Sequence, residues 1–578
     1  MRRMSVGVFL VAAGMSCAAF SFQLDPLGVG ERKIILAGWE FNNLRPEDFL
    51  SNAEKLDKTP ADGFVVPILE NPAVGRNFGT MTLMTEPLWK DELLEDLVPQ
   101  FREMTKHRSM RHCFLKGLKV PTNVRLDWRD DKAWAVAASN VSAVARLARK
   151  SGFRGIQMDV EDYWRKRQFF RIETDPPTPD LRKIVRQRGR QVFSAVFNAY
   201  PDITVLSYFG VSAIFFMQED RMAQSLALAK RDLLTAFMNG MLDVMPPTAR
   251  FVEGIENAYK FDYAKKDFLT ARTRIYNWYL PLIAPENRLK YLSQVATGFG
   301  LYLDMYINKK GGDWYFGDID GSRLEYLRRN AAQALSATDE YIWFWGECGM
   351  WIDWSEKTMK RIQRTARTKC WSELIPGGLN ECLLILKDPR GHLLPRIEKA
   401  IADGVVTNII SNPFCKIPNA AVASSDPLPV PSPFLTWQRE PKKGIEKSII
   451  AADPTVGDGD ANSVFIKGVN GGCVHFNLQP VKPGSYFYVS ASVKGDGAWP
   501  FMNFMSGKTW LDDRIFLPIE GECATSWRTI RACVRVPDAA TMLSLTFGVS
   551  NLGPSETVWY DNICLYELPE QLVTGMEK

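Results

Sequence analysis

Eight short apolar segments recur along the first two thirds of the chain, and their recurrence constrains the fold more than any other feature. Each has the length and residue types of a buried β-strand, and stretches with helical periodicity separate them, most clearly at Asp131–Ser151. The segments are Lys33–Glu40, Asp62–Pro67, His112–Leu118, Gly152–Glu161, Thr204–Phe209, Arg250–Glu256, Gly298–Tyr306 and Tyr341–Glu347. Alternating strands and helices predict an α/β fold, a (β/α)8 TIM barrel, with a doubly wound open sheet as the alternative.

Several of these segments end in an acidic side chain. The acids at these ends are Glu40, Asp159 with Glu161, Glu256, Asp304 and Glu347. In a barrel the C-terminal ends of all strands converge on one mouth, where active sites lie. An open sheet would not gather these acids as naturally, so their placement favours the barrel and predicts a site at its mouth.

The fourth segment, Gly152–Glu161, divides its side chains between two faces. Because a strand sends successive side chains to opposite sides, Ile156, Met158 and Val160 share an apolar face. The opposite face carries Gln157, Asp159 and Glu161. Buried acids are costly unless they are paired or used. Asp159 and Glu161 are therefore catalytic candidates, with a structural ion pair as the alternative.

Composition changes after about Gly404, where a Pro-rich run extends to Pro433 and gives way to alternating β patterns without helices. The clearest expected strands are Tyr486–Lys494, Trp527–Val534 and Thr557–Tyr566. Many short strands between turn residues predict an all-β jelly-roll sandwich. We therefore expect a barrel at 30–375, a helical connector at 376–405 and a sandwich at 406–570.

The first 21 residues have the pattern of a secretory signal peptide. Arg2 and Arg3 precede an apolar run at Val6–Ala13, and small residues around Ser16–Ala19 offer a cleavage site. The run is too short to span a bilayer, and we expect no membrane-spanning segment elsewhere. The protein is expected to be secreted or periplasmic. A lipid anchor on Cys17 is the alternative, although Gly14 stands where a lipoprotein would carry leucine.

The net charge and the numbers of cysteine and histidine residues limit the kinds of function that the chain can have. A formal net charge of +5 over 578 residues gives no case for nucleic-acid binding. Nine cysteines remain beyond the signal segment, an odd number without a Cys-x-x-Cys pair, and the chain has 4 histidines. These counts favour neither a disulfide framework nor a metal site, so we expect no cofactor. Any catalysis should rest on carboxylates.

The fourth segment resembles the signature of the chitinase-like family 18 glycoside hydrolases, Asp-Gly-x-Asp-x-Asp-x-Glu on the fourth barrel strand. Gly155, Asp159 and Glu161 match the pattern, whereas Arg154 and Gln157 stand at its first two acids. The resemblance implies that Glu161 is the general acid and that Asp159 orients an N-acetyl group of the substrate.

A second resemblance leads to other roles. The α-galactosidase and α-glucosidase clans place an aspartate nucleophile at the same strand end, which implies that Asp159 is the nucleophile. The acid would then come from the sixth segment, where Glu253 and Glu256 lie. Both resemblances imply a barrel glycosidase. Further side chains at the strand ends are expected to bind the sugar: Trp39, Glu40, Tyr208, Tyr302, Asp304, Trp345 and Glu347.

The region from Asn408 to about Leu568 resembles the carbohydrate-binding modules appended to secreted polysaccharide enzymes. Its opening Asn-x-x-x-Asn-Pro-Phe and closing Trp-Tyr-Asp-Asn-Ile-x-Leu-Tyr carry the resemblance. Three tryptophans are expected either to stack on sugar rings or to pack in the core: Trp437, Trp499 and Trp510.

Two functions remain open on the sequence. The first is a secreted glycoside hydrolase that cleaves a polysaccharide or a glycoprotein glycan by carboxylate acid/base catalysis. The second is a non-catalytic glycan-binding protein on the same barrel, which the residues at Arg154 and Gln157 favour. A second carboxylate near Glu161 across an open cleft would indicate the enzyme.

Overall fold

The computed structural model describes most of the 578 residues. The described positions are 27, 30–68, 89, 92, 94–119, 125–161, 168–215, 232–362, 369–417, 427–438, 440–441, 443–512, 514–550 and 552–576. The chain forms two compact units, Glu31–Lys387 and a second one that contains Asp388–Lys578. Within the described ranges, no helix is both long and apolar enough to cross a membrane.

The first unit is built around a parallel sheet whose strands follow one another in chain order. The strands are β1 (Lys33–Gly38), β2 (Gly63–Val66), β3 (Phe114–Lys119), β4 (Gly155–Asp159), β5 (Thr204–Ser207), β6 (Arg250–Glu253), β7 (Val295–Thr297), β8 (Phe299–Tyr302) and β9 (Tyr341–Gly346). The last strand, β9, pairs with both β1 and β8, and β6 pairs with β7. Strands β7 and β8 are separated only by Gly298 and together count as one strand of the ring. The sheet therefore has the eight strand positions of a TIM-like barrel.

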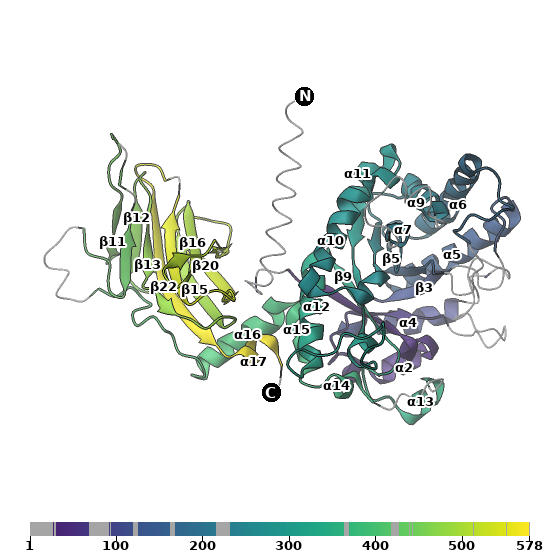
Figure 1. Ribbon diagram of the computed structural model, residues 1–578, viewed down its shortest axis with the longest axis horizontal. Coiled ribbons are helices and arrows are strands. Elements are labelled where there is room, and N and C mark those ends of the chain that lie inside the picture. The colour runs from purple at the N-terminus through teal and green to yellow at the C-terminus, as the bar shows by residue number, and fades with distance from the viewer. Residues whose placement is uncertain are drawn as a thin grey trace. The chain divides into compact units, whose positions relative to one another are not determined.

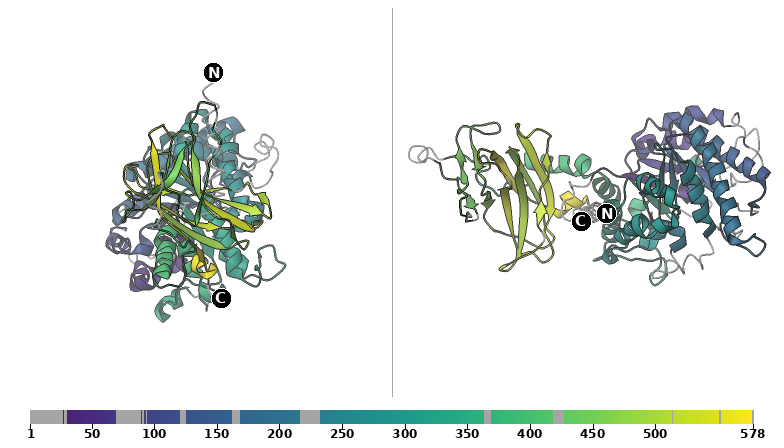
Figure 2. Two further views of the ribbon diagram at one scale, coloured as in Figure 1. Left: turned by 90° about the vertical axis from the view of Figure 1, so that its left-hand side faces the viewer. Right: turned by 90° about the horizontal axis from the view of Figure 1, so that it is seen from above.

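Helices lie outside the strands of this unit (Figures 1 and 2). They are α2 (Pro46–Ser51), α3 (Ala53–Leu56), α4 (Val98–Met104), α5 (Asp131–Ser151), α6 (Thr178–Ala199), α7 (Ser212–Phe215), α9 (Asp232–Val244), α10 (Asp267–Thr273), α11 (Arg288–Gln294), α12 (Arg323–Ala337), α13 (Glu356–Ile362), α14 (Trp371–Leu374) and α15 (Leu379–Lys387). The sequence sets clear limits for α5. The Asp130 side chain accepts from the Ala133 N–H at its start, and Gly152 takes the left-handed conformation, φ 76°, at its end.

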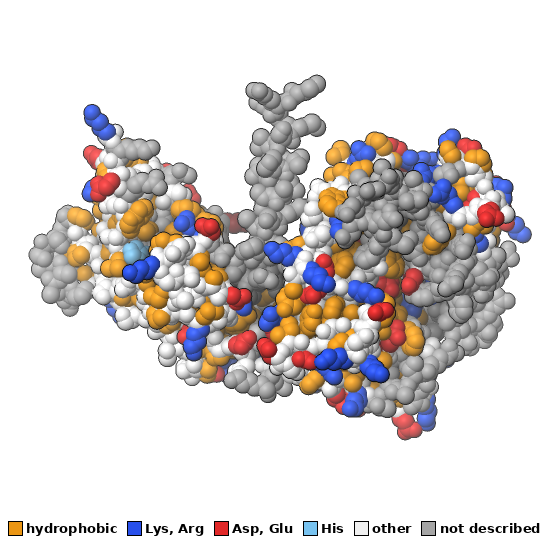
Figure 3. Space-filling view, in the orientation of Figure 1, with side chains coloured by type: hydrophobic (Ala, Val, Ile, Leu, Met, Phe, Trp, Pro, Cys, Tyr) orange, Lys and Arg blue, Asp and Glu red, His pale blue; other side chains and the backbone are white. Residues whose placement is uncertain are grey.

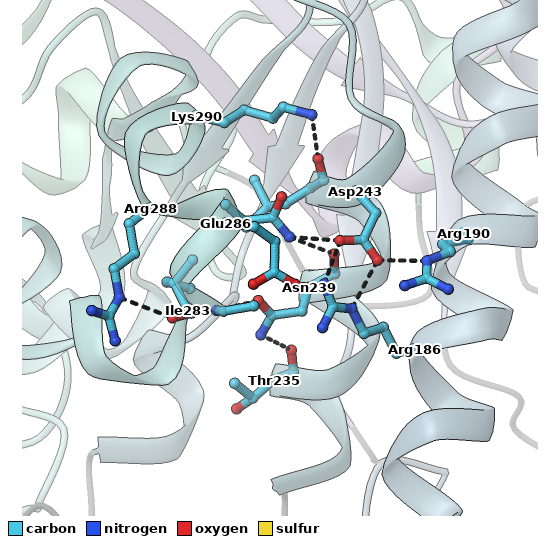
Figure 4. A network of polar contacts seen from close by, with 12 residues as sticks. Arg186, Arg190, Thr235, Asn239, Asp243, Ile283, Glu286, Arg288 and Lys290 are labelled. Carbon is cyan, nitrogen blue, oxygen red and sulfur yellow. Dashed lines mark hydrogen bonds and ion pairs between the residues drawn. The ribbon is translucent and has the colours of Figure 1, made fainter.

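Helices α6 and α9 approach each other closely at two glycines. A Cβ at Gly240 would lie 2.1 Å from the carbonyl oxygen of Arg186, and one at Gly189 would lie 2.2 Å from that of Phe237. Beside this crossing, Asp243 of α9 accepts from Arg186 Nε at 2.8 Å and Arg190 Nε at 2.6 Å (Figure 4). Asn287 donates to the same carboxylate at 2.7 Å. The helices are thus joined by backbone contact and by ion pairs.

One irregularity in the barrel sheet bears on the site. Strand β3 pairs with β4 through Lys116↔Gln157 and then Leu118↔Met158, so that Gly117 forms a bulge. A Cβ at Gly117 would lie 2.7 Å from the Ile156 Cβ, which explains the glycine. Beyond the bulge the register continues with Lys119↔Asp159. Both lysines therefore lie beside residues of the inward face of β4.

The second unit is an antiparallel β-sandwich preceded by α16 (Pro389–Ala402) and followed by α17 (Glu570–Thr574). One sheet contains β10 (Phe434–Trp437), β13 (Gly472–Phe476), β14 (Gln479–Pro480), β16 (Ala498–Ser506), β17 (Thr509–Trp510), β18 (Ile515–Phe516) and β21 (Met542–Val549). The other contains β11 (Ile449–Asp453), β12 (Ser463–Lys467), β15 (Tyr486–Lys494), β19 (Ile519–Glu520), β20 (Arg528–Arg535) and β22 (Thr557–Leu568). Their facing side chains form one apolar core, in which Phe487, Phe504 and Phe547 are buried.

The predicted fold class, a TIM barrel followed by an all-β sandwich, is confirmed. Several strand limits differ from the sequence expectation, most clearly those of the seventh strand. The seventh strand was expected at Gly298–Tyr306, but extended structure begins at Val295 and stops at Tyr302. Leu303–Tyr306 form a 3-10 turn instead, so Tyr302 and Asp304 do not lie on one face of a strand as expected. In this turn the Asp304 carboxylate accepts hydrogen bonds from the backbone N–H groups of Glu347 and Cys348, which follow β9.

Candidate active site

The predicted catalytic residues Asp159 and Glu161 lie at the C-terminal end of β4, at the mouth of the barrel. Asp159 ends β4, is nearly buried, and accepts from the Glu161 backbone N–H at 2.9 Å. On the neighbouring strand the Lys119 ammonium lies 3.9 Å from the other Asp159 oxygen. Glu161 is half-buried, and its neighbours Asp162, Tyr163 and Trp164 lie outside the described residues. The ion-pair alternative for Asp159 thus has a specific partner, although the separation is longer than a hydrogen bond.

An aromatic pair crosses the barrel next to Asp159. The Tyr208 ring, directly after β5, stacks on Trp343 of β9 with centroids 4.1 Å apart and planes inclined by 13°. Trp345 meets Tyr208 edge-on at 6.2 Å. Since β5 and β9 are not neighbours in the sheet, these rings fill the interior of the barrel and form a floor for the mouth.

The Tyr208 hydroxyl is buried, and among the residues that the structure describes it has no hydrogen-bond partner. Burial raises the pKa of Tyr208 well above its usual range, and the charges of Asp159 and Glu256 raise this pKa further. The phenol therefore stays protonated. Backbone hydrogen bonds bring both acids to this residue: the Tyr208 N–H donates to the Met158 carbonyl oxygen at 3.0 Å, one residue before Asp159, and the Glu256 N–H donates to the Tyr208 carbonyl oxygen.

The turn after β6 is locked by its neighbours. Gly254 donates to the Ser207 carbonyl oxygen at 2.7 Å, and its own carbonyl accepts from Trp343 Nε1 at 2.8 Å. The Glu256 N–H donates to the Tyr208 carbonyl oxygen at 2.9 Å. Between them Ile255 has φ 39°, a conformation that a β-branched residue rarely adopts. This strained turn fixes the half-buried Glu256 beside Tyr208.

Glu253, the other acid of the sixth segment, serves the scaffold. It is fully buried, and one carboxyl oxygen accepts from the Gly210 N–H and from the Ser212 hydroxyl, each at 2.5 Å. Burial raises the pKa of Glu253. Of the two acids considered for this strand, Glu256 is the one that is not fully buried.

Two other predicted sugar ligands are also buried supports. Asp304 is completely buried, and its two oxygens accept from the backbone N–H groups of Glu347 at 2.9 Å and Cys348 at 3.0 Å. Burial raises the pKa of Asp304. Glu40 accepts from the Trp351 N–H at 3.0 Å and from Trp354 Nε1 at 2.6 Å. Both acids hold segments that follow β9, and Trp39 beside Glu40 is exposed.

The remaining predicted ligands form a cluster at β8 and β9. Trp345 Nε1 donates to a Glu347 carboxylate oxygen at 3.3 Å. Tyr302 stacks on Tyr259 at 5.2 Å, and Trp314, which is exposed, meets Tyr302 edge-on at 5.8 Å. Aromatic faces beside a carboxylate are the usual surface for a sugar ring, which offers both C–H groups and hydroxyls.

Sequence reasoning missed three side chains at this mouth: Asn42, Lys116 and Lys119. Lys116 donates to Asn42 Oδ1 at 2.5 Å. Burial and the nearby Lys119 charge lower the pKa of Lys116 to about 8, against the opposing pull of Asp159. The glycine after Lys116 is the one sequence signal of the bulge that turns both lysines toward β4. Within the described ranges, no three His, Cys, Asp or Glu side chains are grouped as metal ligands.

A groove of about 1250 Å³ lies on one face of the sandwich. Trp437, Trp499 and Trp510 line it and are 57%, 40% and 53% exposed, so they do not pack in the core. Register places Trp437, Cys473, Gly548 and Trp499 in one row across β10, β13, β21 and β16. Three strand spacings separate the two tryptophans, about 14 Å between their backbones. Hydrophobic, histidine and basic side chains meet on the sandwich surface in Figure 3.

No protein-family model matches the sequence, and no curated protein matches it. Among solved structures, the chain is similar to the enzymatically active domain of bacteriophage CBA120 tailspike protein 4, with 15% identity over 28% of this chain and 21% of that chain, TM-score 0.22. It is similar to the CBM22-1–GH10 modules of Clostridium thermocellum xylanase 10B, with 13% identity over 21% of this chain and 25% of that chain, TM-score 0.18. A CBM4 structure matches with 16% identity over 28% of this chain and 99% of that chain, TM-score 0.19. The chain therefore spans a quarter or less of the two enzyme chains.

Proposed function

We propose that the protein is an exported glycoside hydrolase that cleaves a glycan at the barrel mouth and holds the polymer in the groove of the sandwich. The supporting observation is the environment of Tyr208. Its backbone bonds to Met158, one residue before Asp159, and to Glu256, so Tyr208 lies between acids from the ends of two strands that are not neighbours. Two carboxylates that approach one point from different sides are what glycoside cleavage requires.

The contacts of the two carboxylates suggest separate roles. The Lys119 ammonium and the Glu161 N–H both favour negative charge on Asp159, which suits the ionised carboxylate of the pair. Glu256 is half-buried beside Tyr208, and we assign it the protonated role, donation of a proton to the leaving oxygen. Glu161, adjacent to Asp159, is the alternative proton donor. A protonated Tyr208 would donate to a sugar oxygen between them.

The experiment that tests this proposal combines a digestion screen with matched variants. Purified full-length protein is incubated with a broad library of glycans and aryl glycosides, and new reducing ends are measured. On the natural glycans, Asp159→Asn and Glu256→Gln should each lower kcat at least about a thousandfold with little change in Tm, whereas the exposed control Glu356→Gln should keep wild-type rates. Wild-type turnover in Asp159→Asn would refute the catalytic pair.

The proton donor is identified by leaving-group dependence. With an activated aryl glycoside the leaving phenolate needs little protonation, so loss of the acid should spare cleavage of that substrate more than cleavage of a natural linkage. Glu256→Gln should show this selective loss. If Glu161→Gln shows it and Glu256→Gln does not, the donor is Glu161, as the family 18 resemblance implies.

A non-catalytic glycan-binding function is the second candidate. The observation that favours it is the placement of Lys119 near Asp159, because a permanent ion pair would occupy the carboxylate. Glycan binding by the wild-type protein without turnover of any library member would select this function.

The first 21 residues are proposed to be a signal peptide that is removed during export. Expression with the native N-terminus in a bacterial host, followed by N-terminal sequencing of the exported protein, should find cleavage near residue 21. A mature protein that begins at Cys17 with a lipid-modified thiol would select the lipoprotein alternative, and retention of Met1 would contradict export.

A further inference from the structure

The bulge at Gly117 concentrates positive charge on one side of the mouth. Without it, side chains of β3 would alternate strictly, and Lys116 and Lys119 would lie on opposite faces. With it, Lys116 pairs with Gln157 and Lys119 pairs with Asp159, two residues of the same inward face. Two ammonium groups from one strand therefore share the β3–β4 side of the mouth with one carboxylate.

Among the described residues, Lys116 and Gln157 on this side and the neighbouring Tyr208 have more N–H and O–H donors than acceptors. In the described part of the chain, the Lys116 ammonium has the neutral Asn42 Oδ1 as its hydrogen-bond acceptor, although it carries three N–H groups. Gln157 is 4% exposed, and its amide nitrogen has no hydrogen-bond partner among the described residues. The Tyr208 hydroxyl, directly after the neighbouring strand β5, also has no hydrogen-bond partner among the described residues. Buried donors without acceptors are destabilising, so their retention points to a ligand that supplies the acceptors.

We propose that Lys116, Lys119 and Gln157 form a subsite for the carboxylate of an acidic sugar, so that the glycan cleaved at the mouth contains a uronic acid. The inference rests on the proposed glycosidase function and specifies its substrate class. A sugar carboxylate offers several acceptor positions and one negative charge, which match the surplus of N–H donors and the one ammonium that Asp159 does not balance.

The distribution of charge around the mouth gives the substrate an orientation. Glu256 and Glu347 follow β6 and β9, whereas both lysines belong to β3, and Asn42 follows β1. Opposite charges attract, so the sugar carboxylate lies on the β1–β3 side, where both lysines are. The glycosidic bond then extends toward Asp159 and Tyr208. Contact with a carboxylate also stabilises the proton on Lys116, whose pKa burial lowers to about 8.

The test compares binding of two ligands that differ in one group. Oligogalacturonate and its carboxyl-reduced counterpart, an oligogalactoside, are titrated into full-length Glu256→Gln protein by calorimetry; a second pair consists of oligoglucuronate and its reduced form. The acidic member of at least one pair should bind about tenfold more tightly, and added NaCl should reduce this preference. Lys116→Met and Lys119→Met should abolish the preference, Lys116→Arg should retain part of it, and the exposed control Lys58→Met should leave it unchanged.

The outcomes separate this inference from the proposed function. Turnover of neutral glycans without any preference for the acidic member would overturn the subsite and leave the hydrolase proposal intact. Preferential binding that requires Lys116, without turnover by wild-type protein, would support the subsite and refute hydrolysis. A preference that survives in Lys116→Met and Lys119→Met, or equal or absent binding of both members of both pairs, would overturn the subsite. Unchanged Tm of the variants excludes misfolding as the cause of a loss.

Discussion

Tyr208 and Trp343 stack face to face across the barrel, with ring centroids 4.1 Å apart. The Trp343 indole N–H donates to the Gly254 carbonyl oxygen, two residues before Glu256, and the Tyr208 carbonyl accepts from the Glu256 N–H. The aromatic pair therefore connects β5 and β9 with the turn after β6. Packing of the barrel interior and placement of a candidate catalytic carboxylate depend on the same two rings.

Tyr208→Phe separates the hydroxyl from the ring. The hydroxyl is buried without a partner in the described structure, so its removal should leave the free energy of unfolding unchanged or raise it slightly. If this hydroxyl donates to the substrate, KM should rise and kcat/KM should fall about tenfold or more. Tyr208→Ala also removes the ring and should cost about 3–5 kcal/mol of stability. Chemical denaturation and steady-state kinetics of both variants check this, and a strongly destabilised Tyr208→Phe would contradict it.

Asp304→Ala should disorder the Glu347 segment while the barrel strands persist. The Asp304 carboxylate accepts from two backbone N–H groups there, and alanine would leave both buried donors unsatisfied, at a cost of about 2–4 kcal/mol. Asp304→Asn keeps one acceptor oxygen and should cost less. Hydrogen exchange of peptides that contain Glu347 and Cys348 should rise in Asp304→Ala. Unchanged exchange there would show that Asp304 does not hold this segment.

Most of the barrel could be predicted because its signal is local. Most of the buried strands, which have three to six residues, show as apolar runs, and α5 carries its own cap residues Asp130 and Gly152. The acids at the strand ends were visible for the same reason. Their burial was not, since Glu40 and Asp304 are enclosed by backbone N–H groups from segments about 310 and 43 residues away in the chain.

The lysines at the mouth were missed for a different reason. A strictly alternating strand would put Lys116 and Lys119 on opposite faces. The bulge that places both on the same face depends on how β3 pairs with β4. The division of Trp437, Trp499 and Trp510 between core and surface was likewise left open by the sequence. Pairing of β10, β13, β21, β16 and β17 decides it, because the register puts all three residues on the same face of the sheet, where their rings are exposed.

The tryptophans of the groove should affect binding and not folding. Because Trp437 and Trp510 are more than half exposed, Trp437→Ala and Trp510→Ala should change Tm little. Each loses one stacking surface, so pull-down on an insoluble polymer that the wild-type protein binds should weaken severalfold in both variants. Turnover of a small aryl glycoside should stay at the wild-type rate. Loss of this turnover as well would show that the groove variants disturb the barrel.

Lys387→Met should destabilise the barrel unit strongly. The Lys387 ammonium bonds to Asp62 Oδ1 at 2.6 Å, and both side chains are buried. Removal of the cation leaves a buried carboxylate without its counter-charge, at a cost of about 3–5 kcal/mol. Asp62 Oδ2 also accepts from the Ile34 N–H at 2.9 Å, and the double variant Asp62→Asn/Lys387→Met keeps an acceptor there. The double variant should regain part of the loss in chemical denaturation. Equal stability of the single and double variants would contradict a charge-based cost.

The raised pKa of Asp561 should make the stability of the sandwich depend on pH. Burial, together with the charges of Asp460 and Asp458, raises the pKa of Asp561 to about 6, although N–H groups of Asp458 and Asn562 oppose the shift. The folded state therefore holds this proton more tightly than the unfolded state, whose aspartate titrates near 3.9. Protonation stabilises the fold fully below pH about 4, and this contribution disappears as the pH rises to about 6.

Hydrogen exchange of β22 peptides reports the sandwich separately from the barrel in the full-length protein. Between pH 4 and 6 the free energy of opening, corrected for intrinsic exchange, should fall in wild-type protein relative to Asp561→Asn, which cannot titrate at this position. Above pH 6 the difference should stay constant. The exposed turn variant Asp496→Asn is the matched control and should follow the wild-type curve. Parallel curves for wild type and Asp561→Asn from pH 4 to 7 would refute the raised pKa of Asp561.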